Sequence, residues 1–138
     1  MAYFGKYNFN VDTANRIIIP SRFREQLGAE AVFYRAEEGC LYLYDTPSFE
    51  AILAPFRYLG GTQDGRKQMR LKVYDQTSPA SVDRNGRLVI PAECMEHAGI
   101  KDEVMIVGAD NRIEVWNKDT YTAHAADADK IDMPPIVF

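Results

Sequence analysis

The chain has 138 residues and a formal net charge of −4, with 46% hydrophobic and 26% charged residues. This size and composition are typical of one compact globular unit. The absence of any run of about 18 apolar residues excludes a membrane-spanning helix, and without a hydrophobic signal core near Met1 we expect a cytoplasmic protein.

The first elements predicted along the chain are a strand, a tight turn, a second strand and a helix. Residues 6–11 alternate polar with apolar side chains, which is typical of a half-buried strand. A turn at Asn15 follows, because asparagine tolerates the left-handed backbone region. Residues 17–19 are three isoleucines and predict a fully buried strand. Residues 20–27 predict a helix that begins at a proline and ends before a glycine.

A hairpin and two helices complete the first half of the chain. Residues 32–44 predict a β-hairpin, with its turn at residues 37–39. Asp45 or Thr46 is a suitable N-cap for a helix that we expect to reach residue 59. Two glycines then end this helix, and residues 62–74 predict a second, basic helix.

The second half repeats this plan at an offset of 71 to 72 residues. Residues 82–91 match residues 11–20 at five of ten positions. The turn is Asn85-Gly86, which predicts a type I′ turn with positive φ at both residues. Residues 88–90 predict a buried strand, and residues 91–98 predict a helix that begins at a proline. Residues 104–116 predict a hairpin, and Asn117 is expected to cap a helix from residue 120. Residues 132–138 predict an extended tail.

The duplicated motif resembles the AbrB-type DNA-binding half, which reads Asp, two residues, Gly, Arg, three residues, Pro. Residues 83–91 match this pattern fully, and residues 12–20 match it with Asn15 in place of glycine. Two such halves in one chain are similar to the MraZ family of bacterial transcriptional regulators. Further similar segments support this resemblance over nearly the whole chain: residues 21–27, 97–99, 103–108 and 114–116.

The resemblance implies an α+β fold, namely a tandem, pseudo-twofold, AbrB-like swapped-hairpin β-barrel with short peripheral helices. Residues 1–71 would form the first half and residues 72–138 the second, joined in one compact unit. The resemblance also implies a nucleoid-associated regulator that binds double-stranded DNA at G-rich boxes repeated upstream of the division and cell-wall gene cluster. It implies a closed ring of copies, without a cofactor or a small-molecule substrate.

The resemblance assigns DNA contact to the two motif arginines, Arg16 and Arg87. A guanidinium group matches O6 and N7 of guanine. Asp12 and Asp83 are predicted to orient these arginines through ion pairs. The alternative is that each arginine only forms this ion pair and does not contact DNA. The predicted DNA-binding set lies at the two turns and on the helix after the first: Arg16, Arg87, Arg84, Arg22, Arg24, Asn15 and Asn85. Because Gly86 strains its turn less than Asn15 does, we expect Arg87 to be the more precisely held of the two arginines.

Charge is distributed unevenly, which bears on how strongly one copy can bind DNA. Residues 1–92 carry 12 Lys and Arg against 10 Asp and Glu, whereas residues 93–138 carry 4 against 10. The cluster Arg66, Lys67, Arg70 and Lys72 would contact phosphates or form a solvated face. Because phosphate neutralisation dominates affinity, one chain should bind weakly, and we expect an oligomer. The candidate interface is formed by the exposed apolar residues near Phe56, Tyr58 and Leu59.

Two other functions are compatible with the residues. Asp12 and Asp83 could form the shared-proton dyad of an aspartic protease, but the second copy lacks the hydroxyl residue and the glycine of that loop, so we expect no enzyme. An antitoxin-like AbrB-fold module that binds another protein is the second alternative, and the acidic last third favours it. Cys40 and Cys94 are expected in the core, and no metal site is expected at His97, His124 or elsewhere.

Overall fold

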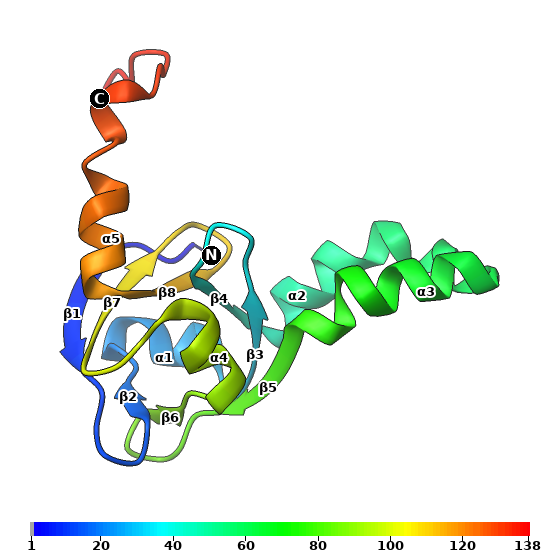
Figure 1. Ribbon diagram of the computed structural model, residues 1–138, viewed down its shortest axis with the longest axis horizontal. Coiled ribbons are helices and arrows are strands. Elements are labelled where there is room, and N and C mark those ends of the chain that lie inside the picture. The colour runs from blue at the N-terminus through cyan, green and yellow to red at the C-terminus, as the bar shows by residue number, and fades with distance from the viewer. Residues whose placement is uncertain (1) are drawn as a thin grey trace.

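The computed structural model describes residues 2–138 and shows a mixed α/β fold of antiparallel strands and short helices (Figure 1). The strands are β1 Lys6–Asn10, β2 Arg16–Ile18, β3 Glu30–Arg35, β4 Leu41–Asp45, β5 Thr77–Ser81, β6 Arg87–Val89, β7 Glu103–Gly108 and β8 Ile113–Asn117. The α-helices are α1 Ser21–Leu27, α2 Thr46–Leu53, α3 Gln63–Lys72, α4 Ala92–Ala98 and α5 Lys118–Ala125. This mixed fold agrees with the expected class.

The strands of the two halves are interleaved in one sheet. Six strands pair in the order β1-β7-β8-β4-β3-β5, and β2 pairs with β6 in a separate two-stranded ribbon. Under the repeat, β1 corresponds to β5, β3 to β7 and β4 to β8, so exchanging the halves leaves this order unchanged. The first strand of each half therefore pairs with the hairpin of the other half.

The hydrogen-bonded ladders among residues 2–138 do not close into the predicted barrel. Within the described part of the chain, β1 pairs only with β7 and β5 only with β3, so the six-stranded sheet has two open edges. The short strands β2 and β6 pair as their own ribbon instead of joining those edges into one ladder.

The core lies where the ribbon packs under the sheet and against α1 and α4. Ile17, Ile19, Leu88 and Ile90 are buried there. The residues between them are not buried, because Ile18 is 46% exposed and Val89 53% exposed. The prediction of fully buried strands is therefore wrong at these two positions. A two-stranded ribbon covers the core with one face and turns alternate side chains toward solvent.

The predicted helix limits are mostly confirmed by the caps. Pro20 and Pro91 directly precede α1 and α4, and Gly28 and Gly99 are the C-cap residues that follow these helices. Both glycines have positive φ, as is common after the last turn of a helix.

Side-chain caps start two later helices. The Ser48 N–H donates to Asp45 Oδ1 over 2.7 Å, and the Thr120 N–H donates to Asn117 Oδ1 over 3.0 Å. The helix expected to reach residue 59 ends at Leu53 and continues as the 3₁₀ segment Ala54–Gly61. Pro55 lies at the start of this segment and cannot donate a backbone hydrogen bond.

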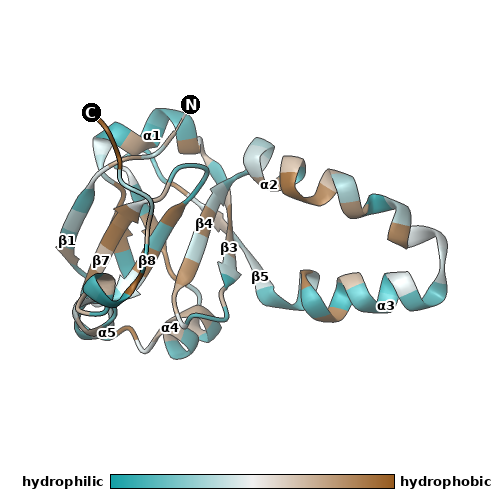
Figure 2. Ribbon diagram, turned by 90° about the horizontal axis from the view of Figure 1, so that it is seen from above, coloured by the Kyte–Doolittle hydropathy of each residue, from teal (hydrophilic) through white to brown (hydrophobic). Residues whose placement is uncertain are grey.

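Two parts of the chain project from the sheet. The first is the arm, residues 46–72, in which α2, the 3₁₀ segment and α3 form a helical hairpin (Figure 2). The second is the tail, residues 127–138, which follows α5 and contains no strand. Figures 1 and 2 both place arm and tail on opposite sides of the sheet. No helix within residues 2–138 is long and apolar enough to span a membrane.

Candidate nucleic-acid interface

Each copy of the repeated motif forms a three-residue hairpin loop. In the first loop, the Asp12 N–H donates to the Arg16 carbonyl over 3.0 Å, and the Asn15 N–H donates to the Asp12 carbonyl over 3.1 Å. The second loop repeats these bonds between Asp83 and Arg87 over 2.8 Å and from Gly86 to Asp83 over 3.0 Å.

The loop type differs from the prediction. Positive φ occurs at Gly86, where it is 76°, but not at Asn85, so the turn is not of type I′. Asn15 has a φ of 58° at the equivalent position, as expected. One left-handed residue at the end of a three-residue loop is the pattern of a turn followed by a β-bulge. The extra loop residue accounts for the difference.

The two loops are tied to each other across the repeat. The Ile90 N–H donates to the Asn15 carbonyl, and the Ile19 N–H donates to the Gly86 carbonyl, both over 2.8 Å. The left-handed residue of each loop is therefore held by the buried isoleucine that follows the short strand of the other half. This arrangement fixes both loops relative to one rigid core.

The register of the ribbon brings the motif arginines onto one face. Arg16 lies opposite Val89, and Ile18 lies opposite Arg87. Because side chains alternate along a strand, these four side chains share the outer face, which we call the ribbon face. Sequence reasoning missed Ile18 and Val89 as surface residues, although their central position in each aliphatic triplet was the available signal.

Each motif aspartate holds its loop and lies next to its arginine. Asp12 Oδ1 accepts hydrogen bonds from the backbone of Ala14 and Arg16, each over 2.9 Å, and Oδ2 accepts from Arg16 Nε over 2.8 Å. These bonds, led by the one from the Arg16 backbone, lower the pKa of Asp12. The Arg87 backbone N–H likewise lowers the pKa of Asp83. The predicted ion pairs are both present.

The relative tightness of the two ion pairs is the reverse of the expectation. Arg87 Nε lies 3.6 Å from Asp83 Oδ2, compared with 2.8 Å for Arg16 and Asp12. Arg87 Nε is also buried and has no hydrogen-bond partner among residues 2–138. The turn residue sets the path of the backbone, whereas this distance depends on the rotamer of the arginine. Easier turn geometry at Gly86 therefore does not produce a tighter pair.

The other predicted DNA-binding residues lie around the loops, and one of them, Arg24, is held by an internal hydrogen bond. Arg22, Arg84, Asn15 and Asn85 are exposed. Arg24 is half-buried, and its Nε donates to the Ile19 carbonyl over 2.8 Å. Its guanidinium covers the second loop so closely that a Cβ added to Gly86 would lie 2.1 Å from Arg24 Cζ. Arg24 therefore has a structural role that sequence reasoning did not predict.

The basic cluster from Arg66 to Lys72 is separate from the loops. It lies on α3 in the arm, away from β2 and β6 (Figure 1). The sequence places this cluster shortly before the second motif, but β5 intervenes and carries the chain back to the sheet. Any phosphate contact by the cluster would therefore involve a different face of the protein.

The two cysteines lie in the protein interior. Cys40 and Cys94 are buried, as expected. Cys40 lies with Glu38 and Glu114 in a group whose ligand atoms are within 4.8 Å of one another. Burial raises the pKa of Cys40, which disfavours the thiolate that binds metals. Glu114 already accepts hydrogen bonds from Arg112 and Trp116, so this group is explained by internal pairing.

The histidines also have internal neighbours. His97 Nε2 lies 2.8 Å from the Ala36 carbonyl oxygen. The ring of His124 packs on Trp116 with centroids 4.6 Å apart. These contacts give both histidines packing roles.

Comparison with known proteins finds one family and many relatives. A family model described as "MraZ protein, putative antitoxin-like" matches residues 2–68 and 73–133. A protein of Clostridium acetobutylicum named transcriptional regulator MraZ is 32% identical over 122 residues, which cover 88% of this chain and 86% of the relative. Proteins with the same name from Clostridium tetani and Acetivibrio thermocellus are 33% and 31% identical over 86% and 91% of this chain, and over 84% and 87% of their own lengths.

Proposed function

Since the chain belongs to the MraZ family, we propose that it is a DNA-binding transcriptional regulator that reads DNA with the ribbon face. The observation that supports this most directly is the register of β2 and β6, which gathers Arg16 and Arg87 on one exposed face of a rigid ribbon. A two-stranded ribbon is one of the elements that fit the major groove of B-DNA. The relatives are named as regulators and not as enzymes, in keeping with this function.

The two arginines would read guanine. Asp12 engages Nε of Arg16, so the terminal amino groups of the guanidinium are the atoms that would extend to the base. Each bidentate contact to guanine O6 and N7 discriminates against another base by about 1–3 kcal/mol. Asp12 and Asp83 would restrict the arginine rotamers and thereby reduce the entropy lost on binding.

The aliphatic side chains between the arginines add a second kind of readout. Ile18 and Val89 lie on the ribbon face, diagonal to each other between Arg16 and Arg87. In the major groove, an apolar side chain can contact the C5 methyl group of thymine. The ribbon face would therefore favour thymine next to guanine.

The remaining predicted residues would position the protein on the phosphate backbone. Arg22, Arg84, Asn15 and Asn85 are exposed around the loops and can donate to phosphate oxygens. Arg24 would contribute mainly by holding the second loop, through its hydrogen bond to Ile19. Contacts of this kind fix register and orientation but carry no sequence information.

We propose that the two halves, residues 1–71 and 72–138, act as one unit in the swapped-hairpin arrangement of the AbrB type. The exchange of β1 and β5 between the halves supports this. The proposed targets are boxes repeated upstream of the division and cell-wall gene cluster, bound in the cytoplasm at the nucleoid. We propose that a ring of copies binds them. A single chain of net charge −4 would bind DNA weakly. In a ring, once one copy is bound, the other copies are held at a high effective concentration near the remaining boxes.

The test measures the affinity of arginine variants for DNA from the region upstream of the chain's own gene, by fluorescence anisotropy at fixed salt concentration. Arg16→Ala and Arg87→Ala should each weaken binding by about 10- to 100-fold, equivalent to one lost guanine contact. Lys130→Ala, which removes one positive charge from a side chain 80% exposed on the tail, is the control and should bind as the unaltered chain does.

Arg22→Ala separates phosphate contact from base readout. It should weaken binding to all sequences equally and reduce the salt dependence by about one ion. Unchanged affinity of both Arg16→Ala and Arg87→Ala would disprove the assignment of the ribbon face. A chain that binds no DNA at low salt would favour the antitoxin-like alternative.

A further inference from the structure

The tail carries a run of large apolar side chains that the rest of the chain leaves exposed. Five such residues lie within eight positions: Ile131, Met133, Ile136, Val137 and Phe138. Val137 is 93% exposed. Exposed apolar runs of this kind mark interaction sites. Pro134 and Pro135 restrict the backbone to extended forms, which reduces the entropy lost when the tail binds a partner.

An apolar groove lies along the arm and extends to where the arm meets β3 and β4. Two cavities of about 170 and 320 Å³ lie along it and share Phe56 as a lining residue. The first is lined by aromatic side chains, among them Tyr34, Tyr44 and Phe49, and the second includes Met69 and Tyr74. We call this pair of cavities the arm groove. Phe56 and Tyr74 are about half exposed at 49% and 47%, so the groove is open to a partner.

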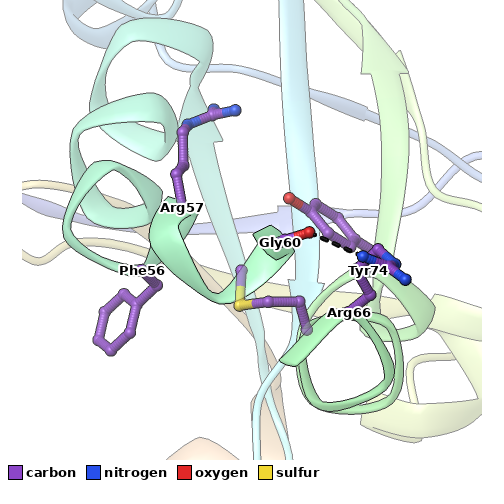
Figure 3. A pocket seen from close by; sticks show the side chains of 6 residues that line it. Phe56, Arg57, Gly60, Arg66 and Tyr74 are labelled. Carbon is purple, nitrogen blue, oxygen red and sulfur yellow. Dashed lines mark hydrogen bonds between the residues drawn. The ribbon is translucent and has the colours of Figure 1, made fainter. Parts of the chain in front are cut away.

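Two arginines flank the apolar part of the arm groove. Arg57 comes from the 3₁₀ segment and Arg66 from α3, and both line the larger cavity. Figure 3 shows the Arg66 guanidinium beside the Tyr74 ring, with its Nη1 donating to the Gly60 carbonyl over 3.0 Å. Arg57 pairs with Glu50 on α2. Arg57 is thus already paired with a carboxylate, whereas Arg66 bonds a neutral carbonyl, so an occupant with apolar side chains next to a carboxylate suits this groove.

The tail has this chemistry. Residues 127–138 carry three aspartates against one lysine, whereas residues 46–72 of the arm carry five Lys and Arg against two acidic residues. Asp132 directly precedes Met133, so a carboxylate adjoins the apolar run. We propose that the tail of one copy docks in the arm groove of a second copy. A second copy is required because arm and tail lie on opposite sides of the sheet (Figures 1 and 2).

The proposed contact is heterologous, since the donor surface and the acceptor surface differ. Each copy therefore donates one tail and accepts another, and such contacts produce rings when they close and filaments when they do not. This inference rests on one part of the proposed function, the ring of copies, and names the contact that would hold the ring together. It does not depend on the ribbon face or on DNA.

The first test compares the masses of the intact chain and of a variant without residues 131–138, by size-exclusion chromatography with light scattering. The intact chain should form an assembly at micromolar concentration, and the shortened chain should elute as a monomer. Because the deleted side chains are exposed in a single copy, the far-UV circular dichroism spectrum of the shortened chain should match that of the intact chain, which shows that the fold is retained. A monomeric intact chain, or a shortened chain of unchanged mass, overturns the proposal.

A complementation experiment tests the direction of the contact. Phe56→Glu should block the arm groove and also give monomers, and Tyr58→Glu is the matched control, because Tyr58 is 76% exposed on the same segment and lines neither cavity. Mixing the Phe56→Glu chain, which keeps its tail, with the shortened chain, which keeps its groove, should give a one-to-one dimer. Two results together would refute tail docking and indicate an arm-to-arm interface: the Tyr58→Glu chain fails to assemble, and the mixture of the Phe56→Glu chain with the shortened chain forms no dimer.

DNA binding distinguishes failure of this inference from failure of the proposed function. The shortened chain should bind DNA with a single box as the intact chain does, and should lose only the gain in affinity from repeated boxes. Arg16→Ala should weaken binding to the single box and leave the mass of the assembly unchanged.

Discussion

Replacing Gly86 with alanine should destabilise the protein far more than changing the equivalent Asn15. Gly86 has a φ of 76°, and a left-handed backbone costs an L-residue about 1–2 kcal/mol. The new Cβ would also lie 2.1 Å from Arg24 Cζ, so the guanidinium must move. That movement breaks the hydrogen bond from Arg24 to the Ile19 carbonyl, and a bond of this charged type contributes about 1.5–3 kcal/mol.

Alanine also restricts the unfolded chain, which offsets about 0.4–1 kcal/mol of this cost. The free energy of unfolding should therefore fall by about 2–4 kcal/mol. Urea unfolding followed by the fluorescence of the single tryptophan, Trp116, measures it, because this side chain is buried in the folded state. With a typical urea dependence for a small protein, the midpoint should fall by roughly 1–2 M.

Asn15→Gly is the matched control, since it changes the same loop position in the other half. Glycine relieves the left-handed strain but adds freedom to the unfolded chain, so the net change should stay within about 1 kcal/mol. Equal urea midpoints for Gly86→Ala and the unaltered chain would refute the reasoning. They would mean that Arg24 moves without cost and that its contact with the loop is not stabilising.

Three further predictions concern the cap of α2, the first motif and DNA readout. Tyr3→Phe removes the 2.7 Å hydrogen bond to Asp45, which caps α2, so urea unfolding should show a loss of about 1–3 kcal/mol. Burial opposes ionisation of Asp45, but hydrogen bonds from Tyr3 and Ser48 outweigh it and lower its pKa, so NMR titration of Tyr3→Phe should show this pKa rising. The pKa of Asp12 is lowered in the folded chain, so its stabilisation is present above the ordinary value of 3.8 and is lost as the pH falls through the lowered value. Asp12→Asn should remove this part of the pH dependence of the urea midpoint, and a wild-type pH profile in the variant would contradict it. Replacing contacted thymines with deoxyuridine should weaken binding about fourfold per methyl group, as expected for about 0.8 kcal/mol of apolar contact, and should have no effect on a chain with alanine at Ile18 and Val89.

The elements that the sequence predicts well are those determined by neighbouring residues. Pro20 and Pro91 mark the starts of α1 and α4, and Asn117 caps α5 through its own side chain. The left-handed Asn15 follows from the chemistry of asparagine. These features need no knowledge of the rest of the fold, so composition and spacing suffice to find them.

The features that the sequence does not predict depend on contacts between distant residues. The exposure of Ile18 and Val89 follows from the pairing of β2 with β6, which leaves one face of the ribbon in solvent. The need for glycine at position 86 arises partly from Arg24, which is distant in the sequence. The open edges of the sheet likewise follow from which strands pair, and local patterns do not determine pairing.

The interleaved sheet has a consequence for synthesis of the protein on the ribosome. Lys6 in β1 pairs with Val107 in β7, so the first strand has no partner until most of the chain has been made. At a translation rate of about 5–20 residues per second, β1 waits for roughly 5–20 s with its backbone unpaired. During this time β3 and β4 can form their local hairpin, but β1 cannot join the sheet. Assembly of the sheet is therefore a late event in translation, completed only when the second half emerges.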